Sequence, residues 1–264
     1  MRTKGEGRVG SATRSRERDF VGALAKSLAV IESFDATTPR LTLSEVARRS
    51  GLTRAAARRY LLTLVRLSYA ESDGKHYWLT PRVLRLGYAY LSSASLPRLA
   101  QPILEEVGRR TQEVASIAVL DGEEILFLAR SAARRVLAAA TSVGTRFPAY
   151  CTAMGRVLLA SHPEAELERR LKSATLRKIT PKTKTGVREL LGELARVRKQ
   201  GYAVSDEELE IGLRTIAVPV VDSRGHVGLA MAISLQAGRM SVARMVKDLL
   251  PELREGARRL SEML

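Results

Sequence analysis

The chain has few of the residues on which disulfide-bonded or metal-binding proteins depend. Its 264 residues include one cysteine, Cys151, so no internal disulfide can form, which is typical of a reducing compartment. The three histidines, His76, His162 and His226, lie far apart in the sequence, and none has zinc-ligand spacing to another. We therefore expect neither a disulfide framework nor a metal site.

Long apolar runs and the common nucleotide-binding motifs are missing as well. No uninterrupted apolar stretch approaches the ~18 residues needed to cross a bilayer, and residues 1–19 lack the apolar core of a signal peptide. The chain also lacks Gly-x-x-x-x-Gly-Lys and a dinucleotide-binding fingerprint. These absences predict a cytoplasmic protein with no membrane association and no cofactor.

Acidic residues are scarce relative to basic ones. The chain has 44 Lys and Arg against 28 Asp and Glu, a net charge of +16. Such an excess suggests a polyanionic partner, either nucleic acid or an anionic membrane surface. Residues 1–95 hold 17 of the basic and 8 of the acidic residues, so the excess is densest in the first third of the chain. The chain is 45% hydrophobic, which is typical of a globular protein, and its 264 residues are enough for two domains.

Residues 43–67, LSEVARRSGLTRAAARRYLLTLVRL, predict two short amphipathic helices separated by one glycine. Thr42 and Glu45 have the spacing of a capping box, so a helix should begin directly after the threonine. Gly51 can take the left-handed conformation that ends this helix, and Thr53 can cap the next one. The pattern is that of a helix-turn-helix.

The second of these helices has two different faces. Ala57, Leu61, Leu64 and Val65 repeat at helical spacing and should pack in a core. The opposite face is rich in arginine, which can pair bidentately with guanine when such a helix enters the major groove. A solvated arginine face on an ordinary helical hairpin is the simpler alternative. The residues assigned to DNA contact on this helix are Thr53, Arg54, Ala55, Arg58 and Arg59.

Residues 69–79 predict a β-hairpin directly after the helix-turn-helix, because two strand-like runs flank an Asp-Gly turn. A hairpin in this place is the wing of a winged helix-turn-helix. Lys75 at its tip is placed to contact a DNA phosphate. The wing favours double-stranded DNA as the partner.

A tail and a helix precede the helix-turn-helix. Residues 1–19 are rich in glycine, serine and arginine without hydrophobic periodicity, which predicts a disordered basic tail. Leu24, Leu28 and Ile31 predict a helix over residues 20–34 that packs under the helix-turn-helix.

A linker helix follows the wing. Thr80 and Pro81 are typical of a helix start, and Leu84, Tyr88 and Leu91 then form an apolar stripe. The stripe either packs on its own domain or pairs with another subunit. We favour pairing, since a two-fold dimer matches a palindromic DNA site.

Strands and helices alternate in the rest of the chain. Strands joined by short turns with helices around them indicate an α+β fold with a largely antiparallel sheet. We expect strands over 114–120, 124–129, 136–141, 202–205, 215–221 and 227–235, and helices over 99–113, 152–160, 163–171, from a Thr185 cap to Gly201, and after a Ser241 cap. The expected domains are a tail (1–19), a winged helix-turn-helix (20–80), a linker helix and linker (81–97) and a second domain (98–264).

Residues 20–264 resemble the IclR family of bacterial transcription regulators. Residues 144–156, GTRFPAYCTAMGR, and residues 208–220, ELEIGLRTIAVPV, are similar to the two effector motifs of the family, and the stretch before Ser234 resembles its last pocket strand. The residues of these motifs resemble those of the subgroup that controls the β-ketoadipate and hydroxybenzoate pathways. Ala153 stands where many members have serine, and Phe147 where leucine is usual.

This resemblance implies a GAF-like domain that binds a small organic acid, in a homo-oligomer that is either a dimer or a tetramer. The free N–H groups at the start of the 152–160 helix suit a carboxylate, and Arg146, Tyr150 or Arg130 could complete the site. Without the resemblance, core packing is the simpler role for the apolar members. The resemblance assigns the effector site to Ala153, Met154, Ser205, Leu213, Thr215, Ala232 and Ser234, and we add Arg130, Arg146 and Tyr150 as partners for the carboxylate.

Two other functions fit parts of the sequence. Cys151 at a helix start could be a nucleophile for hydrolase-like or other thiol chemistry, but a buried, unreactive thiol is the simpler interpretation. Glu207, Glu208 and Glu210 could form an acid pair, yet a solvated turn or an ion pair with Arg214 is simpler. A protein that coats nucleic acid would have no need for a cavity-forming second domain. We therefore expect a regulator rather than an enzyme, and the features above suit an activator as well as a repressor.

Overall fold

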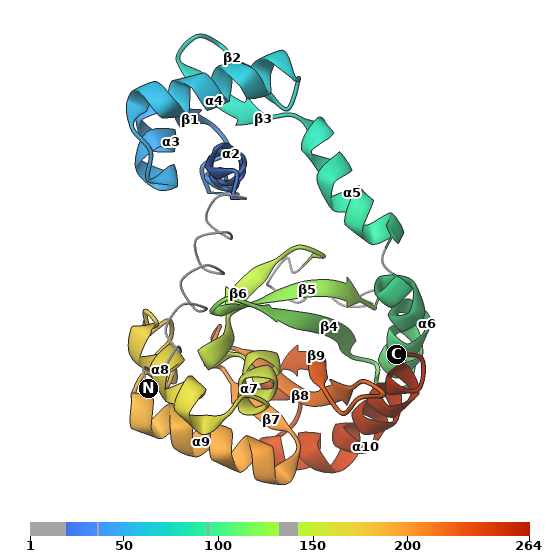
Figure 1. The fold of residues 1–264 in the computed structure, drawn as a ribbon. Coiled ribbons are helices and arrows are strands. Elements are labelled where there is room, and N and C mark those ends of the chain that lie inside the picture. Colours follow the sequence, from blue (N-terminus) through green and yellow to red (C-terminus); the bar gives the residue numbers. More distant parts are fainter. Residues whose placement is uncertain (1–19, 36, 94, 132–141) are drawn as a thin grey trace, which may run out of the picture. The chain divides into compact units, whose positions relative to one another are not determined.

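The computed structural model describes residues 20–35, 37–93, 95–131 and 142–264 (Figure 1). Contacts divide the chain into two compact units, 1–93 and 94–264. The basic tail and the strand expected at 136–141 lie outside the described residues. None of the helices in the described ranges is long and apolar enough to cross a membrane.

The N-terminal unit is a winged helix-turn-helix, as predicted. Its helices are α2 (Gly22–Glu32), α3 (Leu43–Ser50) and α4 (Arg54–Arg66). The wing consists of β2 (Ala70–Ser72) and β3 (His76–Leu79), and β3 also pairs with β1 (Leu41–Thr42). The two-residue β1 was not predicted, because so short a strand has no hydrophobic alternation.

Side-chain caps set the limits of the two central helices. Thr42 and Glu45 form the predicted capping box at the start of α3, and Gly51 ends that helix with φ of 67°. The Thr53 hydroxyl accepts a hydrogen bond from the amide of Ala56 and caps α4. The first N–H groups and the last carbonyl groups of a helix have no partner within it, and each cap forms a hydrogen bond with one of them.

The packing of α2 differs from the prediction. Leu24 and Leu28 were expected to lie under the helix-turn-helix, but their side chains are 61% and 43% exposed. Val30 is fully buried instead, and Ile31 and Phe34 pack around the same core. Helical spacing identified an apolar face, but it could not show that only the last turn of the helix is covered.

The helices after the wing also differ in detail. Thr80 caps a short 3₁₀ turn, η1 (Pro81–Val83), and α5 (Leu84–Ser93) follows. Most of the stretch expected as a linker helix and linker, 81–97, is helical, since α5 extends to Ser93 and α6 (Ser95–Thr111) begins at Ser95. Pro97 lies in the first turn of α6, where its missing N–H has no helical partner to lose.

The C-terminal unit is built on a six-stranded sheet in which all pairs between described strands are antiparallel (Figure 1). This confirms the α+β fold. Thr185 does not cap α9 (Val187–Gln200), because the residue before that helix is Gly186, which makes no side-chain cap. The strands, in sheet order, are β6 (Arg146–Pro148), β5 (Glu124–Arg130), β4 (Val114–Asp121), β9 (Val227–Gln236), β8 (Leu213–Val221) and β7 (Ala203–Asp206); the helices are α7 (Ala153–Ala160), α8 (Glu164–Ser173), α9 (Val187–Gln200) and α10 (Val242–Ser261), with 3₁₀ turns η2 (Ala149–Cys151) and η3 (Ala237–Arg239).

The two faces of this sheet carry side chains of different size. Large residues such as Ile216, Met231 and Ile233 pack against α6 and α10. The alternate positions are small on the opposite face, where Ala217 and Ala232 pack with α7. Because neighbouring residues of a strand point to opposite faces, this alternation lets α7 lie close to the sheet.

Candidate functional site

A cavity lies between the start of α7 and the sheet. It contains about 640 Å³ of empty space, including its opening to solvent. Most of its lining is apolar, with polar groups at a few positions, as in many small-molecule sites. The apolar lining residues are Val114, Ile125, Phe127, Phe147, Ala153, Met154, Leu209 and Leu213; the polar ones are Ser116, Arg130, Thr152, Ser205, Thr215 and Ser234.

Three hydroxyl groups cross the sheet in one row at this cavity. Ser205 of β7 faces Thr215 of β8 across the strands, and Thr215 faces Ser234 of β9. The Thr215 and Ser234 hydroxyl oxygens are 3.0 Å apart and hydrogen-bonded. The Ser205 hydroxyl donates to the backbone oxygen of Cys151 at 2.9 Å, which ties β7 to the chain just before α7. The row offers hydroxyls to a polar group on a bound molecule.

The first turn of α7 supplies a different kind of polar surface. Thr152 caps the helix by accepting a hydrogen bond from the amide of Gly155 at 3.2 Å. Thr152, Ala153 and Met154 all line the cavity. The first N–H groups of a helix have no partner within it, and the helix dipole places partial positive charge there. This end of the cavity therefore favours an anion.

An aromatic wall and a cation complete the lining. The rings of Phe127 and Phe147 meet edge to face, with centroids 5.9 Å apart and planes at 89°. Arg130 ends β5, where it faces Ser116 of β4. Burial lowers the pKa of the Arg130 guanidinium from its ordinary value, but an arginine so placed still carries its charge.

Three residues expected from the sequence to bind the effector lie outside this cavity. Arg146 donates to the carboxylates of Asp121 at 2.6 Å and Glu124 at 2.7 Å. The Tyr150 hydroxyl donates to the backbone oxygen of Arg177 at 2.5 Å. Ala232 is fully buried in the core beneath α7. The other assigned residues come together as cavity lining: Arg130, Ala153, Met154, Ser205, Leu213, Thr215 and Ser234.

Several lining residues were not among those expected from the sequence. Phe147 and Thr152 lie within the 144–156 motif, so the motif itself pointed to them. Ser116 is a serine inside an otherwise apolar strand, which is a weaker signal. Leu209 lies within the 208–220 motif, whereas only the fold places Val114, Ile125 and Phe127 at the cavity.

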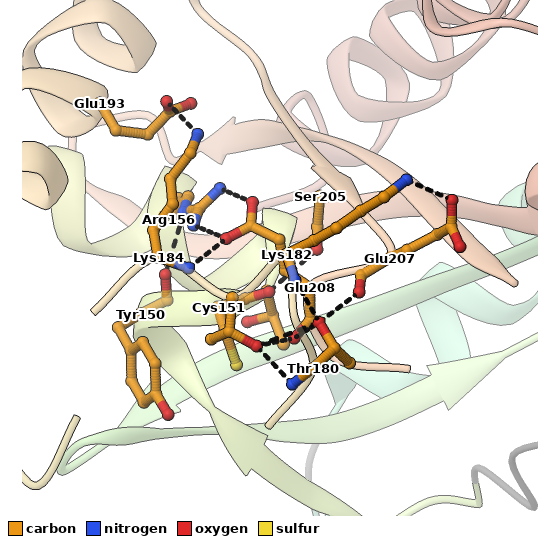
Figure 2. A network of polar contacts seen from close by, with 12 residues as sticks. Tyr150, Cys151, Arg156, Thr180, Lys182, Lys184, Glu193, Ser205, Glu207 and Glu208 are labelled. Carbon is orange, nitrogen blue, oxygen red and sulfur yellow. Dashed lines mark hydrogen bonds and ion pairs between the residues drawn. The ribbon is translucent and has the colours of Figure 1, made fainter. Parts of the chain in front are cut away.

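The acidic cluster after β7 has a different role from the one expected. Arg214 pairs with Asp206, at 2.6 Å between the nearest nitrogen and oxygen, rather than with any of the three glutamates. Glu208 turns inward instead and pairs with Arg156 (Figure 2). Two roles were expected, but none of the three glutamates forms the ion pair with Arg214, and Glu208 is buried rather than solvated.

Cys151 is fully buried in the turn before α7. Burial raises the pKa of its thiol to about 12, so the thiol stays protonated at neutral pH. Since the thiolate is the reactive form, this environment is unsuited to nucleophilic catalysis.

The residues assigned to DNA contact are all exposed. Thr53 caps α4, Arg54, Ala55, Arg58 and Arg59 lie on the first half of that helix, and Lys75 lies at the tip of the wing. No ion pair within the described ranges occupies these basic side chains.

Local hydrogen bonds hold the tip of the wing. One carboxylate oxygen of Asp73 accepts from the amides of His76 at 2.7 Å and Lys75 at 2.9 Å, and these bonds lower the pKa of Asp73 to about 2. Gly74 adopts φ of 92°, which the tight turn requires. The turn therefore fixes the backbone that presents Lys75.

Known proteins match both units of the chain. The family "Bacterial transcriptional regulator IclR C-terminal" matches residues 88–262, and "IclR helix-turn-helix domain" matches residues 23–74. The chain is 43% identical to the Pca regulon regulatory protein of Pseudomonas putida, over 93% of this chain and 85% of that protein. It is 38% identical to the p-hydroxybenzoate hydroxylase transcriptional activator of Acinetobacter baylyi, over 96% of both. The crystal structure of an IclR homolog from Microbacterium hydrocarbonoxydans in complex with 4-hydroxybenzoate aligns with a TM-score of 0.72 and 29% identity, covering 91% of this chain and 98% of that one.

Proposed function

The chain belongs to the IclR family of bacterial transcriptional regulators, and we propose that it responds to a small organic acid bound in the cavity at the start of α7. The family consists of DNA-binding regulators, not enzymes. Among small acids, the proposal favours an aromatic acid or a dicarboxylate formed by its breakdown. One observation carries it: the cavity combines an anion-favouring helix end, an aromatic wall and a row of hydroxyls.

The lining suggests how a hydroxylated aromatic acid would bind. Its carboxylate would accept from the first amides of α7, and Arg130 could add a charge-assisted hydrogen bond. Its ring would lie against Phe127 and Phe147. A hydroxyl substituent would then reach the Thr215 and Ser234 hydroxyls. Each group of the acid thus has a matching surface.

The relatives support this class of ligand. One is named as a regulator of the Pca regulon, and another as an activator of p-hydroxybenzoate hydroxylase. The Microbacterium homolog is described as a complex with 4-hydroxybenzoate. We therefore place 4-hydroxybenzoate first among the acids to test.

On the DNA side, we propose that α4 reads base edges in the major groove while Lys75 of the wing contacts a phosphate. The chain would act as a homo-oligomer, a dimer or a tetramer, because two reading helices match the two halves of a palindromic site. An acid that binds one arrangement of the oligomer more tightly than another would change DNA affinity, and a coupling of ~1–3 kcal/mol would be typical.

Calorimetry on the full chain tests the ligand. 4-Hydroxybenzoate, protocatechuate and β-ketoadipate would be titrated into wild type, Ser234→Leu and Arg130→Ala. We expect at least tenfold weaker binding for both variants, since one fills the cavity and the other removes its cation. Arg146→Ala is the matched control: this arginine pairs with Asp121 and Glu124 outside the cavity, so its loss should leave the affinity unchanged.

Two results would contradict the proposal. If no acid in a wide panel binds wild type, the carboxylate hypothesis is wrong. If an acid binds and Ser234→Leu binds it as tightly as wild type, the binding site lies elsewhere.

A further inference from the structure

A fully buried ion pair connects α7 to the turn between β7 and β8. Arg156 has no exposed surface, and Glu208 is 4% exposed. Two guanidinium nitrogens of Arg156 donate to the two carboxylate oxygens of Glu208, at 2.6 and 2.5 Å, and Nε donates to the backbone oxygen of Tyr150 at 2.9 Å (Figure 2). All three bonds point in directions fixed by the planar guanidinium. The pair therefore defines one position of Glu208 relative to the start of α7.

Other bonds hold the backbone at the same turn. Thr183 donates its hydroxyl to the Glu208 backbone oxygen at 2.7 Å, and Thr180 donates to the Glu207 backbone oxygen at 2.8 Å. The amide of Lys184 donates to the Glu208 carboxylate at 3.2 Å. These donors come from the segment between α8 and α9. The turn is thus tied to a second part of the unit as well as to α7.

The conformation of Glu207 directs the two neighbouring glutamates apart. Its φ is 60°, in the left-handed region that is uncommon for a residue with a side chain. The Glu207 carboxylate accepts from Lys182 at 2.6 Å and from the amide of Gly212 at 3.1 Å, while Glu208 is buried against Arg156 (Figure 2). The surrounding bonds therefore maintain a backbone conformation that is unfavourable by itself.

The same turn supplies part of the cavity wall. Leu209 directly follows Glu208 and lines the cavity, as does Leu213 at the start of β8. On the facing side, Ala153 and Met154 line it less than one helical turn before Arg156. Neither member of the ion pair is itself part of the lining.

We propose that Arg156 and Glu208 are positioning residues that set effector affinity by holding Leu209 and Leu213 against the first turn of α7. This inference rests on the proposed function for the identity of the ligand. Apolar contacts alone have no preferred direction, whereas the bidentate pair allows a single register between the turn and the helix. The pair thus acts on the effector through the two leucines.

Hydrogen exchange on the full chain without ligand tests the holding role. Glu208→Gln keeps the size of the side chain and removes its charge. We expect at least tenfold faster exchange of the amides at 209–213, with the amides of β4 and β9 unchanged. Unchanged exchange at 209–213 would overturn the proposal, and so would an equal rise over the whole sheet, because that would reflect general destabilisation.

Two further variants sharpen this test. Glu193→Gln is the matched control, since Glu193 is also buried but pairs with the side chains of Lys184 and Arg196, whereas Lys184 binds Glu208 through its backbone amide. Its exchange at 209–213 should equal that of wild type. If Glu208→Gln does not fold, the double variant Arg156→Met with Glu208→Met replaces the pair by apolar side chains, which buried sites often tolerate. The same acceleration is expected there.

Calorimetry with 4-hydroxybenzoate, or another acid that binds wild type, tests the consequence for affinity. Glu208→Gln and Arg156→Lys should each bind at least tenfold more weakly, because lysine cannot make the bidentate contact. Glu193→Gln should bind as wild type does. Wild-type affinity in Glu208→Gln would overturn the proposal. If wild type binds no acid, the proposed function fails, and the exchange measurement still decides whether the pair holds the turn.

Discussion

Gly155 lies directly against the backbone of Ala149. A methyl group built on Gly155 would overlap the carbonyl group of Ala149, far inside van der Waals contact. Ala149 begins the 3₁₀ turn that precedes α7, so this contact brings η2 and the first turn of α7 together. The helix start at the cavity depends on a glycine at this position.

Gly155→Ala should destabilise the chain by roughly 3 kcal/mol, because backbone rather than a flexible side chain would have to move. Gly192→Ala in α9 is the matched control: nothing lies within 4 Å of the added methyl group, and alanine should stabilise the helix by ~0.5–1 kcal/mol. Urea unfolding measures both variants. If Gly155→Ala had the same free energy of unfolding as wild type, the close contact between Gly155 and the Ala149 backbone would be contradicted.

Arg58→Ala should weaken operator binding by ~1–3 kcal/mol and relax sequence preference at one base pair, since this arginine lies on the exposed face of α4. Lys75→Ala should weaken all DNA about equally, because a phosphate contact carries no sequence information. Binding to operator and to random duplex at several salt concentrations distinguishes the two. Equal losses on both DNAs for Arg58→Ala would exclude base reading by that residue.

Replacing Leu84 and Tyr88 by aspartate should abolish specific DNA binding. These side chains are 74% and 68% exposed on α5, which suits an apolar contact with a second copy. Charge there would separate the two reading helices while leaving the C-terminal units able to associate. Sedimentation and operator binding would be measured together. Full operator affinity in the double variant would refute the role of this face.

Cys151 should resist alkylation by iodoacetamide in the native protein and react at once after unfolding. Burial raises the pKa of the Cys151 thiol from an ordinary 9.0 to about 12. Between pH 9 and pH 12 the thiol is therefore protonated in the folded state and ionised in the unfolded state. The contribution of this thiol to stability is complete below pH 9 and decreases as the pH rises toward 12. Rapid labelling of folded protein at pH 8 would contradict the burial.

The helix-turn-helix could be predicted from local sequence because its determinants are local. The Thr42–Glu45 capping box, the Thr53 cap and the Gly51 stop each act within a few residues and are present as predicted. The wing followed from an Asp-Gly turn between two strands for the same reason. Such features depend on hydrogen bonds between near neighbours, which a pattern of residue types can report.

Residue spacing alone could not identify every contact of the C-terminal unit. Arg156 and Glu208 are 52 positions apart, and the structure pairs them, whereas the sequence suggested a solvated turn or an ion pair with the nearby Arg214 for that glutamate. Arg146 belongs to a pocket motif, yet its strand register puts it beside Asp121 and Glu124. Strand register and the packing of distant segments decide which face of the sheet a side chain lies on and which residues it contacts.

By itself, the sequence determined the two units, their fold class and the family, because periodicity, caps and motifs are properties of the chain. Only the tertiary structure decided which residues share the cavity. The row from Ser205 through Thr215 to Ser234 exists because three strands align in one register, and its facing wall exists because small residues let α7 approach the sheet. Those relationships arise from long-range pairing and close packing, which no local pattern encodes.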